Sequence, residues 1–303
     1  MSLNLETLQE TRMGLLDKIG KRIDVAIVEA HEKEERRGHL GASQIGHECY
    51  RYLWHVLHWS YKEKFTAKQL RLFNRGTLEE DRIIGWLRSV CEEVLPVNPK
   101  TGKQWRISKF NDIFSGSCDC VIKFNGVWAL TEFKTHGDKS FKELIKHKSV
   151  KASKPVHYSQ MQVYMRELKL DRALYIAINK NTDEMYYEEI TIDLLESDMQ
   201  LSKAEAVITA ESGLDMPKLS ESPLWWQCRV GMCEYHHLCH KGAAPDKNCR
   251  TCAYSSPVQG KVWYCKKHNH NLETIQTQLA ACGDYKPADV FPQSEEPVTF
   301  SLK

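Results

Sequence analysis

The dipeptide Asn125-Gly126 is the feature that most constrains how this chain folds. It stands between two strand-like runs, residues 117–124 and 127–134. Asn-Gly at such a junction is the strongest short-range signal for a β-hairpin, because both residues tolerate the positive φ of a type I′ turn. The two residues that flank the turn then pair with each other, and this sets the register of the whole hairpin.

This register gathers three charged side chains on one face of the hairpin. Asp119 lies directly opposite Glu132, and alternation along the strand puts Lys134 on the same face. Opposed Cβ atoms are about 5 Å apart, so two like charges there destabilise the pair. A divalent cation such as Mg²⁺ takes hard oxygen ligands and neutralises both carboxylates. A half-exposed hairpin with an ordinary polar face is the alternative interpretation.

A third carboxylate is expected on the helix predicted over residues 67–90. One stripe of that helix, at three- and four-residue spacing, carries Phe73, Gly76, Glu80, Ile83 and Leu87. A glutamate in a core-facing stripe is unfavourable unless it is paired or bound to a cation. Glu80 is therefore a candidate metal ligand, the alternative being that its side chain reaches solvent.

Hydrophobic periodicity predicts the other elements of an α/β chain. Helices are expected over residues 5–37, 47–59, 155–168 and 193–210, and strands over 173–178 and 185–192. We expect Ser43 to cap the second of these helices. Gln160 and Tyr164 stand one turn apart on one face of the helix over 155–168, as they would on any amphipathic helix.

Positive charge is concentrated between the hairpin and that helix. Residues 134–154 hold seven lysines against two acidic residues, a local net charge of +5, whereas the whole chain carries only +2. A basic segment beside a group of carboxylates predicts a track for the phosphate backbone of DNA, with solvated surface as the alternative. The lysines expected to bind DNA are Lys139, Lys142, Lys146, Lys148, Lys151 and Lys154.

The order and spacing of these residues resemble those of a known nuclease superfamily. Asp119, then Glu132-Phe133-Lys134, then Gln160-x-x-x-Tyr164, preceded by a helix with Gly76 and Glu80, resemble the RecB-type branch of the PD-(D/E)xK nucleases. Lambda-type exonucleases and the CRISPR-associated RecB-like exonucleases belong to the same superfamily. The resemblance covers residues 40–240 and implies a restriction-endonuclease-like core, in which helices flank a mixed central sheet.

The resemblance also implies roles for individual residues. Mg²⁺ or Mn²⁺ would be held by Glu80, Asp119, Glu132 and the Phe133 carbonyl, and Lys134 would position the attacking water. Gln160 and Tyr164 would contact the DNA strand near the scissile phosphate. The chain departs from the family at Cys118, where a proline often stands, and at Glu80, where histidine is common.

Cysteines are unusually numerous, with eleven in the chain, seven of them in its last quarter. Cytosolic thiols stay reduced, so metal ligation is favoured over disulfides. One group resembles the iron–sulfur staple of RecB-like exonucleases and AddB-type helicase-nucleases, which implies a [4Fe–4S] cluster on Cys49, Cys228, Cys233 and Cys239. Four residues separate Cys228 from Cys233, where the family usually has two. A zinc site using His236 or His237, or simply buried thiols, are the alternatives.

A second cysteine group predicts zinc on the basis of spacing. Cys249 and Cys252 form a CxxC pair, and twelve residues separate Cys252 from Cys265. His268 and His270 are candidates for the fourth ligand, but Cys282 resembles the fourth cysteine of C-terminal zinc modules in some phage-encoded proteins, and we choose it. Four thiolates leave no open coordination position, so such a zinc ion is structural.

These features predict two domains and one leading function. Residues 1–242 are expected to form the nuclease domain with its cysteine staple, and residues 243–303 a zinc-binding module. We expect a metal-dependent DNA exonuclease of the recombination or repair type, encoded by a phage or prophage, acting on DNA ends or single strands with a recombination or replication protein as partner. A structure-specific or restriction-like endonuclease and a non-catalytic DNA-binding adaptor are the alternatives.

The sequence also argues against a membrane protein. The chain contains no run of the ~18 apolar residues that a spanning helix needs. Its first residues lack the apolar segment of a signal peptide. We therefore expect a cytoplasmic location.

Overall fold

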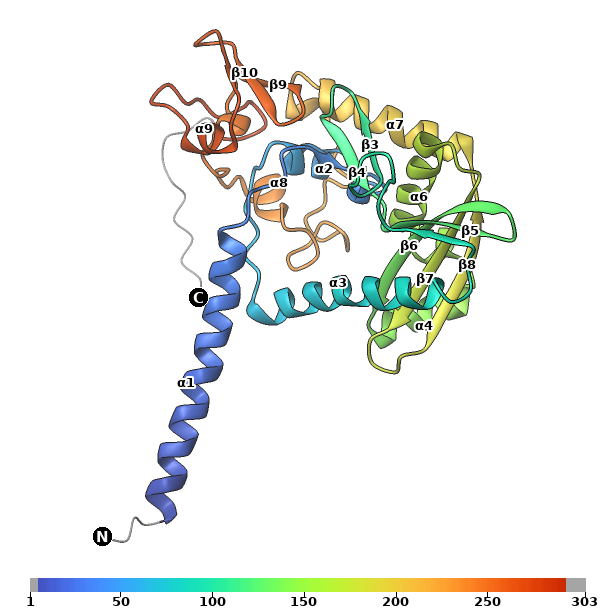
Figure 1. The fold of residues 1–303 in the computed structure, drawn as a ribbon. Helices are drawn as coiled ribbons and strands as arrows, with labels where there is room; N and C mark the ends of the chain where they lie inside the picture. The colour runs from blue at the N-terminus through green and yellow to red at the C-terminus, as the bar shows by residue number, and fades with distance from the viewer. Residues whose placement is uncertain (1–4, 293–303) are drawn as a thin grey trace.

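The chain folds into a mixed α/β structure, and the computed structural model describes residues 5–292 (Figure 1). Its centre is a five-stranded sheet in the order β2-β5-β6-β7-β8. β6 and β7 run parallel and the other neighbouring pairs are antiparallel, so the predicted mixed sheet is confirmed. Its strands are β2 (Glu93–Leu95), β5 (Cys120–Phe124), β6 (Val127–His136), β7 (Arg172–Asn179) and β8 (Met185–Thr191).

Helices cover both faces of this sheet. The parallel pair requires a crossover, and three helices supply it: α4 (Asp138–His147), α5 (Val150–Ser153) and α6 (Pro155–Leu168). α6 packs against one face, with α7 (Leu194–Thr209) beside it, and α3 (Ala67–Leu87) packs against the other. The flanking helices of the predicted architecture are therefore present.

The hairpin has the predicted turn and the predicted register. Asn125 and Gly126 have φ values of 48° and 78°, as a type I′ turn requires. Phe124 pairs with Val127, and the ladder runs without a shift to the last pair, Cys120 with Thr131. The next position along the chain brings residue 119 opposite residue 132.

The sheet is apolar on both faces because each face has its own core. On the α6 side, Met161 belongs to the same buried cluster as Leu130. On the α3 side, Ile83 and Leu87 cluster with Phe133. Burying both faces explains why the strands read as apolar runs, and it fixes the two helices that border the polar end of the hairpin.

A second sheet of three strands leads directly into the hairpin. Its order is β1-β4-β3, formed by β1 (Leu40–Gly41), β4 (Phe114–Ser117) and β3 (Arg106–Lys109). Only Cys118 and Asp119 separate β4 from β5, so the chain passes from one sheet to the other at Asp119.

The N-terminal helices differ from the predicted bounds. The helix expected over 5–37 ends earlier, as α1 (Leu5–Glu32), and it extends away from the body of the molecule (Figure 1). The helix expected over 47–59 is shorter, as α2 (Tyr50–Leu57). Ser43 does not cap it, because Ser43 lies in the short helix η1 (Ala42–Gln44), and the Cys49 side chain caps α2 instead.

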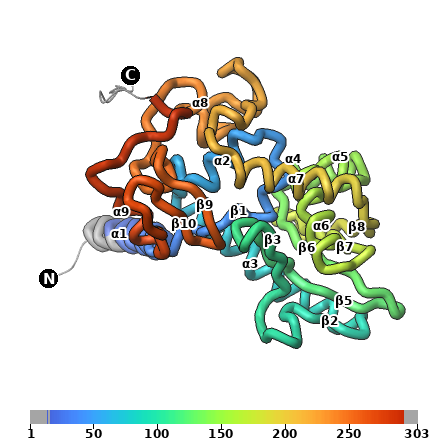
Figure 2. Tube along the Cα trace, turned by 90° about the horizontal axis from the view of Figure 1, so that it is seen from above, coloured from blue at the N-terminus to red at the C-terminus, as the bar shows by residue number. Residues whose placement is uncertain are grey.

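The C-terminal part packs beside the base of α1, away from β2 and β5 (Figure 2). Trp263, Leu272 and Phe291 belong to the same buried cluster as Leu53 and Trp54 of α2, so residues 243–292 share one core with the rest of the chain. Residues 293–303, included in the predicted module, lie outside the described residues. The C-terminal part contains η3 (Cys249–Thr251), β9 (Ser255–Gln259), β10 (Val262–Cys265), β11 (His270–Leu272) and α9 (Ile275–Ala280). Between α7 and this part lie η2 (Gly213–Asp215) and α8 (His236–Lys241).

Within residues 5–292, no helix combines the length and apolar character needed to cross a membrane.

Candidate active site

Two carboxylates meet at the junction of the two sheets, as the register predicts. Asp119 lies at the bend between β4 and β5, and its Oδ2 accepts a hydrogen bond of 2.7 Å from the Phe133 N–H. Glu132, opposite it on β6, is completely buried. Burial raises the pKa of Glu132 to about 7, Lys134 opposes this shift, and the Asp119 carboxylate adds to it. Burial also raises the pKa of Asp119.

One oxygen of Glu132 is well partnered and the other is not. Oε1 accepts a hydrogen bond of 2.8 Å from Gln160 Nε2 and forms an ion pair with Lys134. Oε2 is buried and has no hydrogen-bond partner within the described part of the chain. An orphaned buried carboxylate oxygen is costly, and a divalent cation is the partner that hard oxygen ligands favour. The donor set therefore fits a metal ion.

Lys134 stays charged in this setting. Burial lowers the pKa of its ammonium group, but the carboxylates of Glu132 and Asp119 outweigh that effect and the net shift is upward. A fixed positive charge is thus held beside two negative ones.

The structure brings Glu80 of α3 to the same place. Burial and the Asp119 carboxylate raise the pKa of Glu80 to about 7, while Lys134 opposes the shift. A cleft of about 220 Å³ opens here between α3 and the end of β6, lined by Phe73, Gly76, Thr77, Glu79, Glu80, Ile83, Phe133, Lys134 and Thr135. Glu80 and Lys134 therefore border this cleft, and the Asp119 carboxylate lies close enough to interact with both. The main-chain carbonyl of Phe133, another expected metal ligand, belongs to a residue of the same lining.

The apolar stripe predicted on α3 is only partly buried. Ile83 and Leu87 are in the core, but Phe73 is 54% exposed. The first half of α3 runs beyond the sheet toward α1 (Figure 1), so it has no sheet face to cover. Phe73 lies instead at the edge of the cleft.

Gln160 and Tyr164, which the resemblance implies contact DNA, lie in the interior of the structure. Both side chains are buried, at 4% and 2% exposure. Gln160 bonds Glu132, and the Tyr164 hydroxyl donates a hydrogen bond of 2.9 Å to the Ser117 carbonyl. A Cβ atom at Gly116 would lie 2.5 Å from that hydroxyl, so the close approach requires glycine. The two α6 side chains therefore position the strands that carry the acids.

A histidine pair beside the site is missed by the sequence analysis. The Tyr175 hydroxyl lies 2.9 Å from His136 Nε2 and 2.9 Å from His157 Nδ1. Burial and the charges of Lys154 and Lys134 lower the pKa of His136 to about 4, so its ring is neutral at pH 7. A sequence signal exists, because His136 follows Lys134 on the same face of β6, but its partners lie on other elements.

The lysines of the predicted track fall into three groups. Lys154 is half-buried, and its charge is among the causes that lower the pKa of His136, which places it beside the site. Lys142 pairs with Asp138 at 2.7 Å and Lys151 with Asp193 at 3.2 Å. Three lysines are exposed on or just after α4: Lys139, Lys146 and Lys148.

The first cysteine group comes together around the start of α2. Cys49 caps that helix, and burial, together with a smaller electrostatic contribution from Cys49, raises the pKa values of the other three thiols. Cys239 Sγ also lies 3.4 Å from His55 Nε2. All four cysteines, Cys49, Cys228, Cys233 and Cys239, are free.

The second cysteine group lines one small cavity of about 20 Å³. Its walls include Cys249, Cys252, Cys265 and Cys282, and also His268. Among the described residues, three potential ligand atoms within 4.8 Å of one another are found at His268, Cys282 and Asp284. His270, another residue weighed as fourth ligand, is not among the residues that line the cavity.

No family model matches the sequence, and no curated protein is similar to it. Solved structures with a partly similar arrangement include the protein SSO0001, at 18% identity and a TM-score of 0.41, with 73% of this chain and 96% of that chain covered. An alkaline exonuclease, LHK-Exo, from Laribacter hongkongensis is 19% identical with a TM-score of 0.40. The same enzyme in complex with dAMP gives 18% and 0.41. Both comparisons with LHK-Exo cover 57% of this chain and 87% of the other.

Proposed function

We propose that this protein is a metal-dependent nuclease that hydrolyses phosphodiester bonds in DNA. The observation that carries the proposal is Glu132, a completely buried carboxylate opposite Asp119 whose Oε2 has no partner among the described residues. Carboxylates held in this way, next to a charged lysine, suit a site that binds a divalent cation and a phosphate together.

The acids and the lysine of the candidate site have different roles in this chemistry. Asp119, Glu132, Glu80 and the Phe133 carbonyl would hold Mg²⁺ or Mn²⁺, which supplies polarisation of the phosphate and a lowered pKa of a bound water. The Lys134 ammonium orients the attacking water and offsets the negative charge that grows on the phosphate in the transition state.

Two residues of α6 hold the catalytic carboxylates in position without contacting the reacting atoms themselves. Gln160 fixes the orientation of the Glu132 carboxylate, and Tyr164 fixes the strand that leads to Asp119. Both are positioning residues in this proposal. Lys154, with the exposed lysines of α4, attracts the DNA backbone toward the cleft.

The test of the nuclease is direct. Purified protein with Mg²⁺ or Mn²⁺ should degrade DNA, and Asp119→Ala, Glu132→Ala and Lys134→Ala should each abolish the degradation. Gln162→Leu, a buried change on the same helix as Gln160 but outside the cleft, serves as the matched control and should retain activity. Degradation that survives all three of these substitutions would refute the proposal. Failure of the wild-type protein to bind Mg²⁺ or Mn²⁺ in a titration would favour the non-catalytic adaptor.

We propose that the substrate is a DNA end or single strand and that the enzyme works as an exonuclease in recombination or repair. The sequence resemblance to RecB-like exonucleases supports this choice. Digestion of a linear duplex, with a covalently closed circle left intact, is the expected result. Cutting of the closed circle at a comparable rate would identify an endonuclease instead.

We further propose that Cys49, Cys228, Cys233 and Cys239 hold a [4Fe–4S] cluster. The chemistry of four free thiols gathered from distant segments supports the proposal. The protein purified without oxygen should be brown and contain about four irons per chain. A colourless protein with zinc bound to this group would exclude the cluster.

A further inference from the structure

Four free thiols converge in the C-terminal part from separate stretches of the chain. Cys249 begins η3, Cys252 follows it, Cys265 ends β10 and Cys282 lies after α9. All four line the cavity of about 20 Å³ described above. A cavity of that size has room for about one water-sized particle. The arrangement therefore surrounds a volume suited to a single ion with soft ligands.

We propose that these four thiols bind one structural zinc ion that fastens the C-terminal part to the N-terminal segment. Thiolates are the ligands that closed, tetrahedral zinc sites use. Lys267 also lines the cavity, where its ammonium pairs with Asp284 at 3.0 Å. The proposal does not depend on the nuclease activity.

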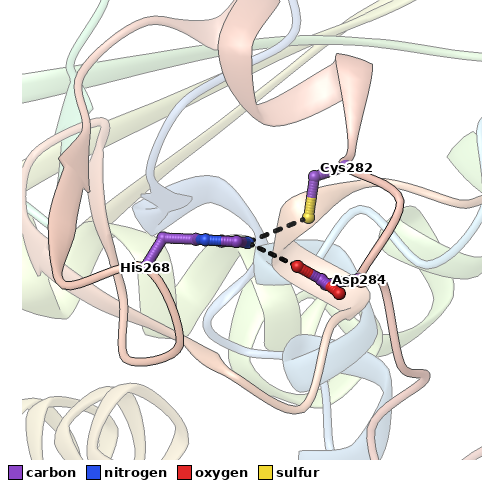
Figure 3. Close-up of side chains that lie close together, drawn as sticks. All are labelled: His268, Cys282 and Asp284. Atoms are coloured by element: carbon purple, nitrogen blue, oxygen red, sulfur yellow. Dashed lines mark hydrogen bonds and ion pairs between the residues drawn. The ribbon is translucent and has the colours of Figure 1, made fainter.

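His268 competes with Cys282 for the fourth position, and in this proposal it has a supporting role because Cys282 completes a set of four thiolates. Its Nε2 lies 3.5 Å from Cys282 Sγ and 3.2 Å from Asp284 Oδ2, so the ring points between the two (Figure 3). All three of these residues are exposed and line the cavity. His268 is thus placed to donate a hydrogen bond to the Cys282 thiolate, as second-layer groups do at zinc sites.

The fastening element is Arg250, which stands between two of the proposed ligands. Its guanidinium is completely buried and stacks 3.5 Å from the ring centre of Trp59. It donates hydrogen bonds of 3.1 Å to the Leu57 carbonyl and 3.1 Å to the Gly38 carbonyl. Its Nε donates a further hydrogen bond of 2.7 Å to Gln278.

Through the buried Arg250, we expect the metal to affect the stability of contacts that lie outside the metal site. No carboxylate pairs with Arg250 within residues 5–292, so its charge is compensated by carbonyl dipoles and aromatic rings. Those partners hold it only while the loop from Cys249 to Cys252 keeps its place. A zinc ion that fixes both cysteines fixes the arginine between them, and with it the contact to α2 and to the segment before β1.

The first experiment measures metal content and thermal stability in the full-length protein. Elemental analysis of the wild type should give one zinc per chain that Cys265→Ser and Cys282→Ser each remove, with a fall in Tm of more than about 5 °C. Cys91→Ser, which changes a cysteine outside both groups, should retain the zinc and the Tm. His268→Ala should also retain the zinc, with faster release to a chelator.

Three results would overturn the proposal. Wild-type protein that contains no zinc, even after addition of Zn²⁺, would remove the site, and this readout does not require any variant to fold. Loss of zinc from His268→Ala but not from Cys282→Ser would overturn the ligand assignment. Zinc removal that leaves Tm unchanged would overturn the fastening role. Arg250→Lys should lower Tm while zinc stays bound, which separates the arginine from the metal.

Discussion

Replacing Gln160 by leucine tests whether the α6 helix tunes the buried carboxylate. The amide of Gln160 donates a 2.8 Å hydrogen bond to Glu132 Oε1. This hydrogen bond is one of the interactions that lower the pKa of Glu132 against the larger effect of burial. Hydrogen bonds to charged groups contribute about 1.5–3 kcal/mol, and one pKa unit corresponds to about 1.4 kcal/mol. Gln160→Leu should therefore raise the pKa of Glu132 by about one to two units.

The expected result is a shift in pH dependence rather than a loss of activity at every pH. The metal requires the ionised carboxylate, so the acidic limb of the pH–rate profile should move upward by about one unit. Affinity for Mg²⁺ or Mn²⁺ should fall by about 10- to 100-fold at pH 7, as it does when groups that orient metal ligands are removed. Raising the metal concentration should restore part of the rate.

The assay is a pH–rate profile on linear DNA at two Mg²⁺ concentrations, with calorimetric titration of Mn²⁺. Gln162→Leu is the matched control, because Gln162 is buried on the same helix but bonds Thr191 and Asp193. It should lower stability and leave the acidic limb in place. The reasoning fails if Gln160→Leu keeps the wild-type limb and metal affinity, or if both variants shift them equally.

Three further predictions follow from the same contacts. Because the folded-state pKa of Glu132 lies above its ordinary value, metal-free protein should lose stability as pH rises from about 4.5 to 7; Glu132→Gln should remove part of that loss in thermal melts, and an unchanged slope would contradict the burial argument. Gly116→Ala should destabilise the fold by about 1–3 kcal/mol in urea titrations, whereas Gly85→Ala, with open space around it, should be neutral or slightly stabilising. Lys154→Ala should weaken DNA binding and lower its salt dependence by about one charge, while Lys142→Ala, whose ammonium pairs with Asp138, should change both less; equal effects would argue against a site-facing role.

The hairpin was predictable because its information is local. Asn125-Gly126 sets the turn, the turn sets the register, and the register alone places Asp119 opposite Glu132. The long helices followed from periodicity in the same way, and α6 has the predicted bounds. None of these predictions required knowledge of which elements pack together.

The contacts between elements could not be predicted from periodicity. Tyr164 was expected to face DNA, but its direction depends on how closely β4 approaches α6, and Gly116 permits that approach only in the folded chain. The neutral histidine pair around Tyr175 joins β6, β7 and α6, which the sequence places far apart. Phe73 fits the core-facing stripe by its spacing, but it is exposed because its helix continues past the edge of the sheet.

The continuity of β4 into β5 has a mechanical consequence. Asp119 sits where a single strand leaves the three-stranded sheet, whereas Glu132 belongs wholly to the five-stranded one. A cation bound by both carboxylates would link the two sheets at the point where they meet. Loading the site would then stiffen the whole molecule, and amide exchange along β4 should slow when the metal binds.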